Sequence, residues 1–223
     1  MEVDNLIIEL TRRCNLKCDH CLRGAAQRVD IDPNTICKFL KKNNIQQIFY
    51  LSFTGGEPCL NIPAIKVITN FLVKQKISIV CFYMATNGTI FNLDMLEPFT
   101  KLYTLIEDVK DQFIIEISND KYHTGKIDPR WNLIKTQFKY KNDKDKEKIY
   151  IISEGRGTIL NGCGRNITDS EWIWREEDQY LEGTVYINAK GQLLKNCDYS
   201  YKTQNIRQHG HCLSKPLLDF VSD

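Results

Sequence analysis

The sequence predicts an α/β fold: a partial parallel barrel of the (β/α)6 type, open on one side, with a short C-terminal β-hairpin and helical extension. Apolar runs alternate with amphipathic stretches over roughly the first 150 residues, which is typical of right-handed β-α-β units in a parallel sheet. A complete eightfold barrel needs about 250 residues, and this chain has 223. The residue pattern changes after about residue 166. We therefore expect a core at 1–165 and an extension at 166–223 that completes or caps it.

The first half of the chain gives two strand–helix units. An apolar run at 6–10 predicts a buried first strand. Asp32 precedes a proline and predicts the start of a helix over 33–42. The run 48–53 predicts a second strand, and apolar residues on one face predict a helix over 63–74.

The middle of the chain repeats this pattern. Residues 77–84 predict a third strand, and 93–103 predict a helix that Pro98 bends or breaks. The apolar run 113–118 predicts the fourth strand. These units extend the same parallel sheet by one strand each.

The remaining elements are shorter. We expect a helix at 129–140, a solvated turn at 141–148 that mixes both charge signs, and a fifth strand at 149–153. Residues 184–194 read as a β-hairpin, with Gly191 in the turn.

Composition narrows the classes of function. A net charge of +2 implies no strong field for nucleic acid, and no apolar run is long enough for a membrane span. The N-terminal residues lack the pattern of a signal peptide, so we expect a cytoplasmic protein. In that compartment nine cysteines indicate metal ligation rather than disulfides.

Three of these cysteines follow the first predicted strand. Cys14, Cys18 and Cys21 are spaced C-x3-C-x2-C in the loop where an α/β sheet places its site. Three thiolates can hold an iron–sulfur cubane and leave one iron open. Zinc would need a fourth ligand, for which His20 is the local candidate. Nearby cations should lower the thiol pKa values and offset the charge of a cluster, namely Arg12, Arg13, Lys17 and Arg23.

Three motifs together resemble the radical S-adenosylmethionine (SAM) enzyme superfamily. The cysteine motif, with a ring residue before its last cysteine, is similar to that family's signature. Residues 55–58, Gly-Gly-Glu-Pro, follow the second apolar run and resemble its second motif, and Thr-Asn-Gly at 86–88 is a weaker third match. All three lie in family order within about the first 120 residues.

The resemblance implies a 4Fe-4S cluster on the three cysteines, with SAM chelated at the open iron. Reductive cleavage of SAM would give a 5′-deoxyadenosyl radical that abstracts hydrogen from a substrate. It also implies an electron donor such as flavodoxin or ferredoxin. No nucleic acid or membrane partner is expected.

The other motif residues would contact SAM. Gly55 and Gly56 would allow close approach, with Glu57 near the ammonium group and Pro58 stiffening the turn. His20 would lie against the adenine. A plain strand-to-helix turn and a surface histidine are the alternatives.

Polar residues after the later strands complete the expected site. Asn87 would lie near the cofactor, Ser118 and Asp120 would bond ribose hydroxyls, and Arg156 would pair with the SAM carboxylate. Tyr122 and His123 are candidates for substrate contact or proton transfer, on a loop that is alternatively an exposed lid.

Six cysteines lie outside the motif. Cys163, Cys197 and Cys212 follow the core sparsely and are candidates for a second metal site, because the tail resembles the opening of the extension in peptide-modifying members. The alternative is that they are small buried hydrophobic residues, as we expect for Cys37, Cys59 and Cys81.

Substrate class stays open between several alternatives. The tail favours a peptide or protein side chain. A small molecule, as in deazaguanine-forming synthases, and activation of a glycyl-radical partner are alternatives within the family, although residues 19–24 lack the threonine of the deazaguanine branch. A zinc-stabilised binding module is the alternative outside it.

Overall fold

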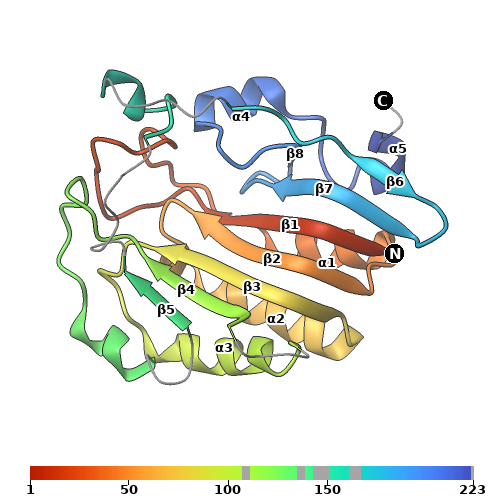
Figure 1. The fold of residues 1–223 in the computed structure, drawn as a ribbon, viewed down its shortest axis with the longest axis horizontal. Coiled ribbons are helices and arrows are strands. Elements are labelled where there is room, and N and C mark those ends of the chain that lie inside the picture. The colour runs from red at the N-terminus through yellow and green to blue at the C-terminus, as the bar shows by residue number, and fades with distance from the viewer. Residues whose placement is uncertain (107–110, 135–138, 143–150, 161–166, 222–223) are drawn as a thin grey trace.

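The computed structural model describes residues 1–106, 111–134, 139–142, 151–160 and 167–221. Its strands form one sheet in the order β5–β4–β3–β2–β1–β7–β6, with β8 paired to β7 (Figure 1). The strands are β1 (Glu2–Thr11), β2 (Gln47–Gly55), β3 (Ser78–Thr86), β4 (Phe113–Ile117), β5 (Lys139–Asn142), β6 (Ile173–Arg175), β7 (Tyr180–Ile187) and β8 (Leu193–Leu194).

The sheet is mostly parallel, as the sequence predicts. All pairs from β5 to β1 are parallel, and so is the pair between β1 and β7, whereas β6 and β8 run antiparallel to β7. Within the described residues β5 forms one edge, and β6 and β8 form the other beyond β7, so the sheet is open rather than closed into a barrel. The parallel pairs bring the carboxyl ends of six neighbouring strands to one edge of the sheet.

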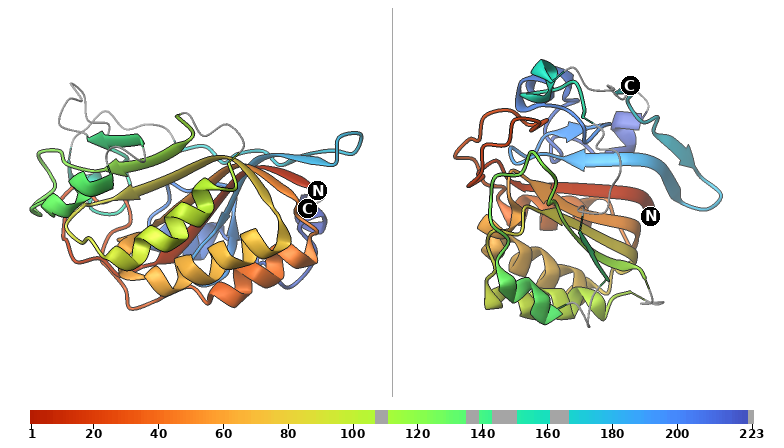
Figure 2. Two further views of the ribbon diagram at one scale, coloured as in Figure 1. Left: turned by 90° about the horizontal axis from the view of Figure 1, so that it is seen from below. Right: turned by 60° about the vertical axis from the view of Figure 1, so that its left-hand side comes forward.

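Helices cover one face of the sheet. α1 (Pro33–Lys42), α2 (Ile62–Gln75) and α3 (Leu96–Tyr103) lie side by side against it, as the left view of Figure 2 shows. α4 (Tyr201–Arg207) and α5 (Leu217–Val221) lie past β7, on the side of β1 that is away from β2 (Figure 1). No helix in the described part of the chain is both long and apolar enough to cross a membrane.

Local signals explain the helix boundaries. Asp32 caps α1 as predicted, because its Oδ1 accepts from the Asn34 amide at 3.0 Å. Asn61 caps α2, which begins at Ile62, one residue before the predicted start. The segment predicted as one helix bent or broken at Pro98 is divided between Met95 and Leu96. A 3-10 turn (Leu93–Met95) comes first, and α3 follows it directly. Pro98 lies in the first turn of α3, where its missing amide hydrogen costs little.

The prediction for residues 129–153 is wrong in its first part. Instead of a helix over 129–140, the chain forms a 3-10 helix at Pro129–Ile134 and then β5, which also takes the first residues of the predicted turn. Most of that turn and the start of the predicted fifth strand, at 143–150, lie outside the described residues. Residues 151–153 are described and are not a strand. The chain therefore reaches its fifth strand earlier than expected.

Alternating residues of β1 divide the interior into two cores. Leu6, Ile8 and Leu10 are fully buried in the main core, on the helix-covered side. Ile7 faces the other way and packs in a smaller core with Tyr186 of β7 and Tyr199. β1 is thus enclosed on both faces, which accounts for the near-continuous apolar run by which the sequence marks it.

Candidate functional site

The carboxyl ends of β1 to β4 surround a cavity of about 210 Å³. Gly55 ends β2 and Thr86 ends β3, and both line this cavity together with the loop that follows β1. The structure brings to it ten of the predicted site residues: Cys14, Cys18, His20, Cys21, Gly55, Gly56, Glu57, Asn87, Ser118 and His123.

The three cysteines are free thiols that line this cavity. Cys18 is buried, and Cys14 and Cys21 are partly buried. The loop turns tightly between them, since the Cys21 amide donates to the Cys18 carbonyl at 3.2 Å. The Leu16 amide lies 3.4 Å from Cys14 Sγ, a donor suited to a thiolate.

The expected lowering of the thiol pKa values is not what the structure gives. Burial raises the pKa of the Cys14 and Cys18 thiols above the ordinary value. The Arg156 charge acts against this effect at Cys18, but the loss of hydration outweighs it. A metal centre must therefore displace protons when it binds here.

The glycine pair allows two backbones to touch. A Cβ on Gly55 would lie 2.4 Å from the Thr11 carbonyl oxygen, and one on Gly56 would lie 2.3 Å from that of Arg13. The Gly56 amide donates to Thr11 and the Glu57 amide to Arg13, each at 2.8 Å. The glycine turn therefore holds the cysteine loop against β2, a close contact within the chain itself.

Glu57 ties this turn to the end of β3. Its carboxylate accepts from the Thr86 hydroxyl at 2.7 Å, the Asn87 amide at 2.8 Å and the Cys59 amide at 3.0 Å. Burial is the largest effect on Glu57 and raises its pKa despite these donors. Pro58 is buried at the start of the short 3-10 helix η1 (Pro58–Leu60).

Asn87 and Ser118 end the next two strands. The Asn87 side chain donates to Asn15 Oδ1 at 3.0 Å and lies 3.9 Å from Cys14 Sγ. Ser118 continues the ladder, because its amide donates to the Thr86 carbonyl at 2.9 Å. Both line the cavity, as Glu57 after β2 also does. Polar groups at the ends of β2, β3 and β4 therefore share one cavity with the cysteines.

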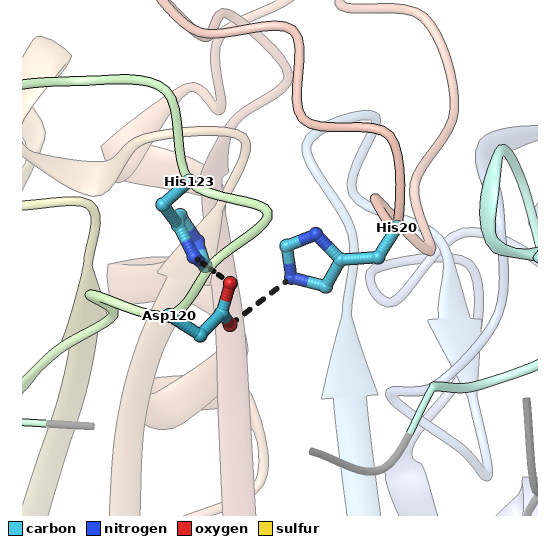
Figure 3. Close-up of side chains that lie close together, drawn as sticks. All are labelled: His20, Asp120 and His123. Atoms are coloured by element: carbon cyan, nitrogen blue, oxygen red, sulfur yellow. Dashed lines mark ion pairs between the residues drawn. The ribbon is translucent and has the colours of Figure 1, made fainter. Parts of the chain in front are cut away.

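His20 and His123 lie on either side of Asp120 (Figure 3). His123 Nδ1 is 2.9 Å from Asp120 Oδ1, and His20 Nε2 is 3.5 Å from Oδ2. Burial lowers the pKa of His20. Burial opposes ionisation of Asp120, but the Tyr122 amide and His123 outweigh it and lower the Asp120 pKa.

Tyr122 completes this group. Its ring centroid is 5.1 Å from that of His20, and its amide donates to Asp120 Oδ1 at 2.8 Å. The loop after β4 is therefore folded onto the cysteine loop through His20. The carboxylate of Asp120 is occupied by these contacts in this structure.

Arg156 lies behind the cysteine loop. Its Nε donates to the Cys18 carbonyl at 2.8 Å and its Nη1 to the Gly24 carbonyl at 2.6 Å. The Arg156 amide also donates to the Cys21 carbonyl at 2.9 Å. Both named guanidinium nitrogens therefore support the loop backbone. The predicted pairing with a carboxylate of SAM stays a prediction.

The two tail cysteines that the structure describes lie in different cores. Cys197 packs against the smaller core, Cys212 is fully buried in the main core, and Cys163 lies outside the described residues. Cys59 and Cys81 are buried as expected, whereas Cys37 is only partly buried.

A buried polar network that the sequence does not predict lies beneath the cysteine loop. Glu9, Arg12 and Gln204 are each fully buried and bonded to one another. One signal was available, since Glu9 is a charged residue within an otherwise apolar strand. Gln204 gave no such signal.

Comparison with known proteins identifies the family. The sequence model of the family described as "4Fe-4S single cluster domain" matches residues 7–122, which include the three motif cysteines, the glycine turn and the first residues of the loop after β4. The chain belongs to this family. An uncharacterized protein of Methanocaldococcus jannaschii is 30% identical over 103 residues, which are 44% of this chain and 35% of that protein. The match thus spans about a third of that relative's length.

Several solved structures share the fold of this family member. anSMEcpe with bound AdoMet and the Cp18Cys peptide has a TM-score of 0.61 at 13% identity, covering 100% of this chain and 81% of that one. BtrN in an open conformation has a TM-score of 0.53 at 14% identity, covering 98% and 79%. SuiB of Streptococcus suis bound to the precursor peptide SuiA has a TM-score of 0.51 at 13% identity, covering 98% and 64%.

Proposed function

We propose that this chain is a radical SAM enzyme that acts on a peptide or protein side chain. Its 4Fe-4S cluster would be held by Cys14, Cys18 and Cys21. The observation that carries the proposal is the single cavity where these thiols meet the glycine turn and the polar ends of β3 and β4. The family match supports the cluster, and the shared fold with AdoMet-bound anSMEcpe supports SAM as its ligand.

The number of thiols favours a cluster over a structural zinc ion. Structural zinc takes four protein ligands, whereas a cubane can be held by three thiolates and keep one iron open for a further ligand. Cys14, Cys18 and Cys21 all line the cavity, and the neighbouring His20 ring is already directed at Asp120, with Nε2 3.5 Å from Oδ2.

When bound, such a centre supplies the electron for reductive cleavage of the sulfonium of SAM. The residues of this chain would position the ligand. The turn at Gly55 and Gly56 lines the cavity beside the cysteines, where its carbonyls suit an ammonium group. Asn87 and Ser118 offer hydrogen bonds at the ends of β3 and β4, and the His20 ring lines the same cavity for the adenine.

Two observations support a peptide substrate. Two of the fold neighbours, anSMEcpe and SuiB, are bound to peptides. In addition, no helix of the described segments covers the sheet face opposite α1, α2 and α3 beside β2, β3 and β4 (Figure 1). An extended chain would reach the cavity along that face.

The test is anaerobic reconstitution followed by dithionite and SAM. We expect four irons per chain and formation of 5′-deoxyadenosine. Cys18→Ala should abolish both, whereas Cys37→Ser, a change on α1, should keep both. A pool of short peptides should raise 5′-deoxyadenosine several-fold over a mixture of free amino acids. If the iron-loaded wild type forms no 5′-deoxyadenosine, the proposal is contradicted. If the two mixtures give equal responses, the peptide substrate is contradicted.

A further inference from the structure

The network beneath the cysteine loop is centred on one carboxylate. Glu9 accepts from Arg12 Nε at 2.8 Å, the Ala189 amide at 3.0 Å and Gln204 Nε2 at 3.0 Å. The Tyr186 hydroxyl donates to it as well. Glu9, Arg12, Tyr186 and Gln204 are all fully buried. Every polar group around Glu9 is thus held away from water.

Arg23 brings a second cation to this network. Its side chain is buried, Nη1 donates to the Tyr199 carbonyl at 2.7 Å, and the guanidinium lies 5.3 Å from the ring centroid of Tyr186. Among the described residues no carboxylate forms an ion pair with Arg23, although the negative charge of Glu9 acts on it from within the network. Two buried guanidinium groups therefore share one carboxylate, which leaves one positive charge in excess.

Burial makes this excess charge costly. An ionised group taken out of water is destabilising unless an opposite charge compensates it. Glu57 is the other buried carboxylate at the cavity, and its oxygens already accept from Thr86, Asn87 and Cys59. The network beneath the loop thus lacks one anion.

The position of Arg23 indicates what that anion is. Arg23 lines the same cavity as the three thiols and comes two residues after Cys21. Its backbone is also fixed, because the Tyr201 amide donates to the Arg23 carbonyl at 3.2 Å. The C-terminal segment 199–204 therefore holds a buried cation beside the place where thiolates would gather.

We propose that Arg23 is the buried counter-charge of the iron–sulfur centre and that it raises the reduction potential of that centre. A cluster on three thiolates is anionic and gains a further negative charge on reduction, so a nearby cation stabilises the reduced form more than the oxidised form. The negative charge of Glu9 would lower the reduction potential. This inference rests on the cluster of the proposed function, but it concerns the potential and not the activity.

The test is a redox titration of reconstituted protein, followed by electron paramagnetic resonance without SAM. Arg23→Gln removes the buried charge, Arg23→Lys keeps it, and Glu9→Gln removes the opposing charge. Arg13→Gln is the control, because Arg13 is in the same loop but 39% exposed and paired with Asp30. Iron content is measured for each variant, so failure to bind a cluster is distinguished from a changed potential.

We expect Arg23→Gln to lower the ratio of reduced to oxidised cluster about tenfold at a fixed potential, or about 59 mV for a one-electron couple. Arg23→Lys and Arg13→Gln should change this ratio much less, and Glu9→Gln should raise it. If the Arg23→Gln variant binds the full amount of iron and its reduction potential is unchanged, the inference is overturned. If Arg23→Gln holds no cluster, the sign of the Glu9→Gln shift decides: a rise supports the inference, and no change or a fall overturns it. Wild type without iron would instead contradict the proposed function.

Discussion

Arg156 donates from Nε to the carbonyl oxygen of Cys18 at 2.8 Å. With its second bond to Gly24, it supports the cysteine loop from the side opposite β2. The loop is thus fixed by the glycine turn on one side and by an arginine 138 residues away on the other.

Arg156→Met should weaken iron retention, because two charge-assisted hydrogen bonds to the loop backbone are lost at about 1.5–3 kcal/mol each. Arg156→Lys should restore it only partly, since an ammonium cannot reproduce the fork. The measurement is iron released to a chelator over time. Arg130→Met, which removes an exposed arginine, is the control. Normal iron retention with lost SAM binding would instead favour the carboxylate role predicted from sequence.

Gly56→Ala should destabilise the protein by about 1–3 kcal/mol, a typical cost of overpacking. The new methyl group would lie 2.3 Å from the Arg13 carbonyl oxygen, and a backbone atom cannot rotate away. Urea unfolding of the metal-free protein measures this cost. Because the same contact holds the cysteine loop, reconstituted iron should fall too. A variant with wild-type stability and iron would show that the loop can move aside.

Asp120→Asn should weaken SAM binding about tenfold, equivalent to about 1.4 kcal/mol, while the iron content stays normal. The substitution replaces one acceptor oxygen by a donor, so His20 and His123 lose their shared carboxylate. Isothermal titration with SAM tests this. Asp128→Asn, at an exposed ion pair farther along the same segment, should bind normally. Equal affinities of the two variants would mean that Asp120 does not orient the His20 ring.

Glu9 should make the metal-free protein sensitive to acid. Burial would raise the pKa of Glu9, but Arg23, Arg12 and the Tyr186 hydroxyl outweigh it, and the pKa is lowered. A lowered pKa stabilises the fold above the unfolded value of about 4.3, and this contribution is lost as the pH falls through the folded value.

Glu9→Gln should therefore cost about 3 kcal/mol at pH 7, and its difference from wild type should shrink below about pH 4. Urea unfolding between pH 3 and 7 measures both curves. Glu97→Gln, at an exposed pair with Lys66 and Lys101, should change little. Parallel curves for wild type and Glu9→Gln would contradict the assignment.

Local patterns are sufficient for most of the sheet and for the place of the three motif cysteines after β1. The apolar runs of β1 to β4 and the Asp32 cap are decided by neighbouring residues, so the sequence predicts them. The same holds for the hairpin at Gly191, whose φ of 73° suits glycine.

The features that the sequence does not predict depend on contacts between distant segments. β5 is a short edge strand, Lys-Tyr-Lys-Asn, that depends on its register with β4 and lacks an apolar pattern of its own. The place of β7 beside β1 and the bond between Arg12 and Gln204 join distant segments, which periodicity does not reveal. The role of the glycine pair was also invisible, because it depends on the path of the cysteine loop.

The bond between Arg12 and Gln204 joins residues 192 positions apart. During synthesis on the ribosome, the cysteine loop is made long before Gln204, which closes the network beneath it. Contacts of such high sequence separation form slowly because a long loop must close first. The thiols of the nascent chain therefore lack this support until residue 204 has been made and has docked.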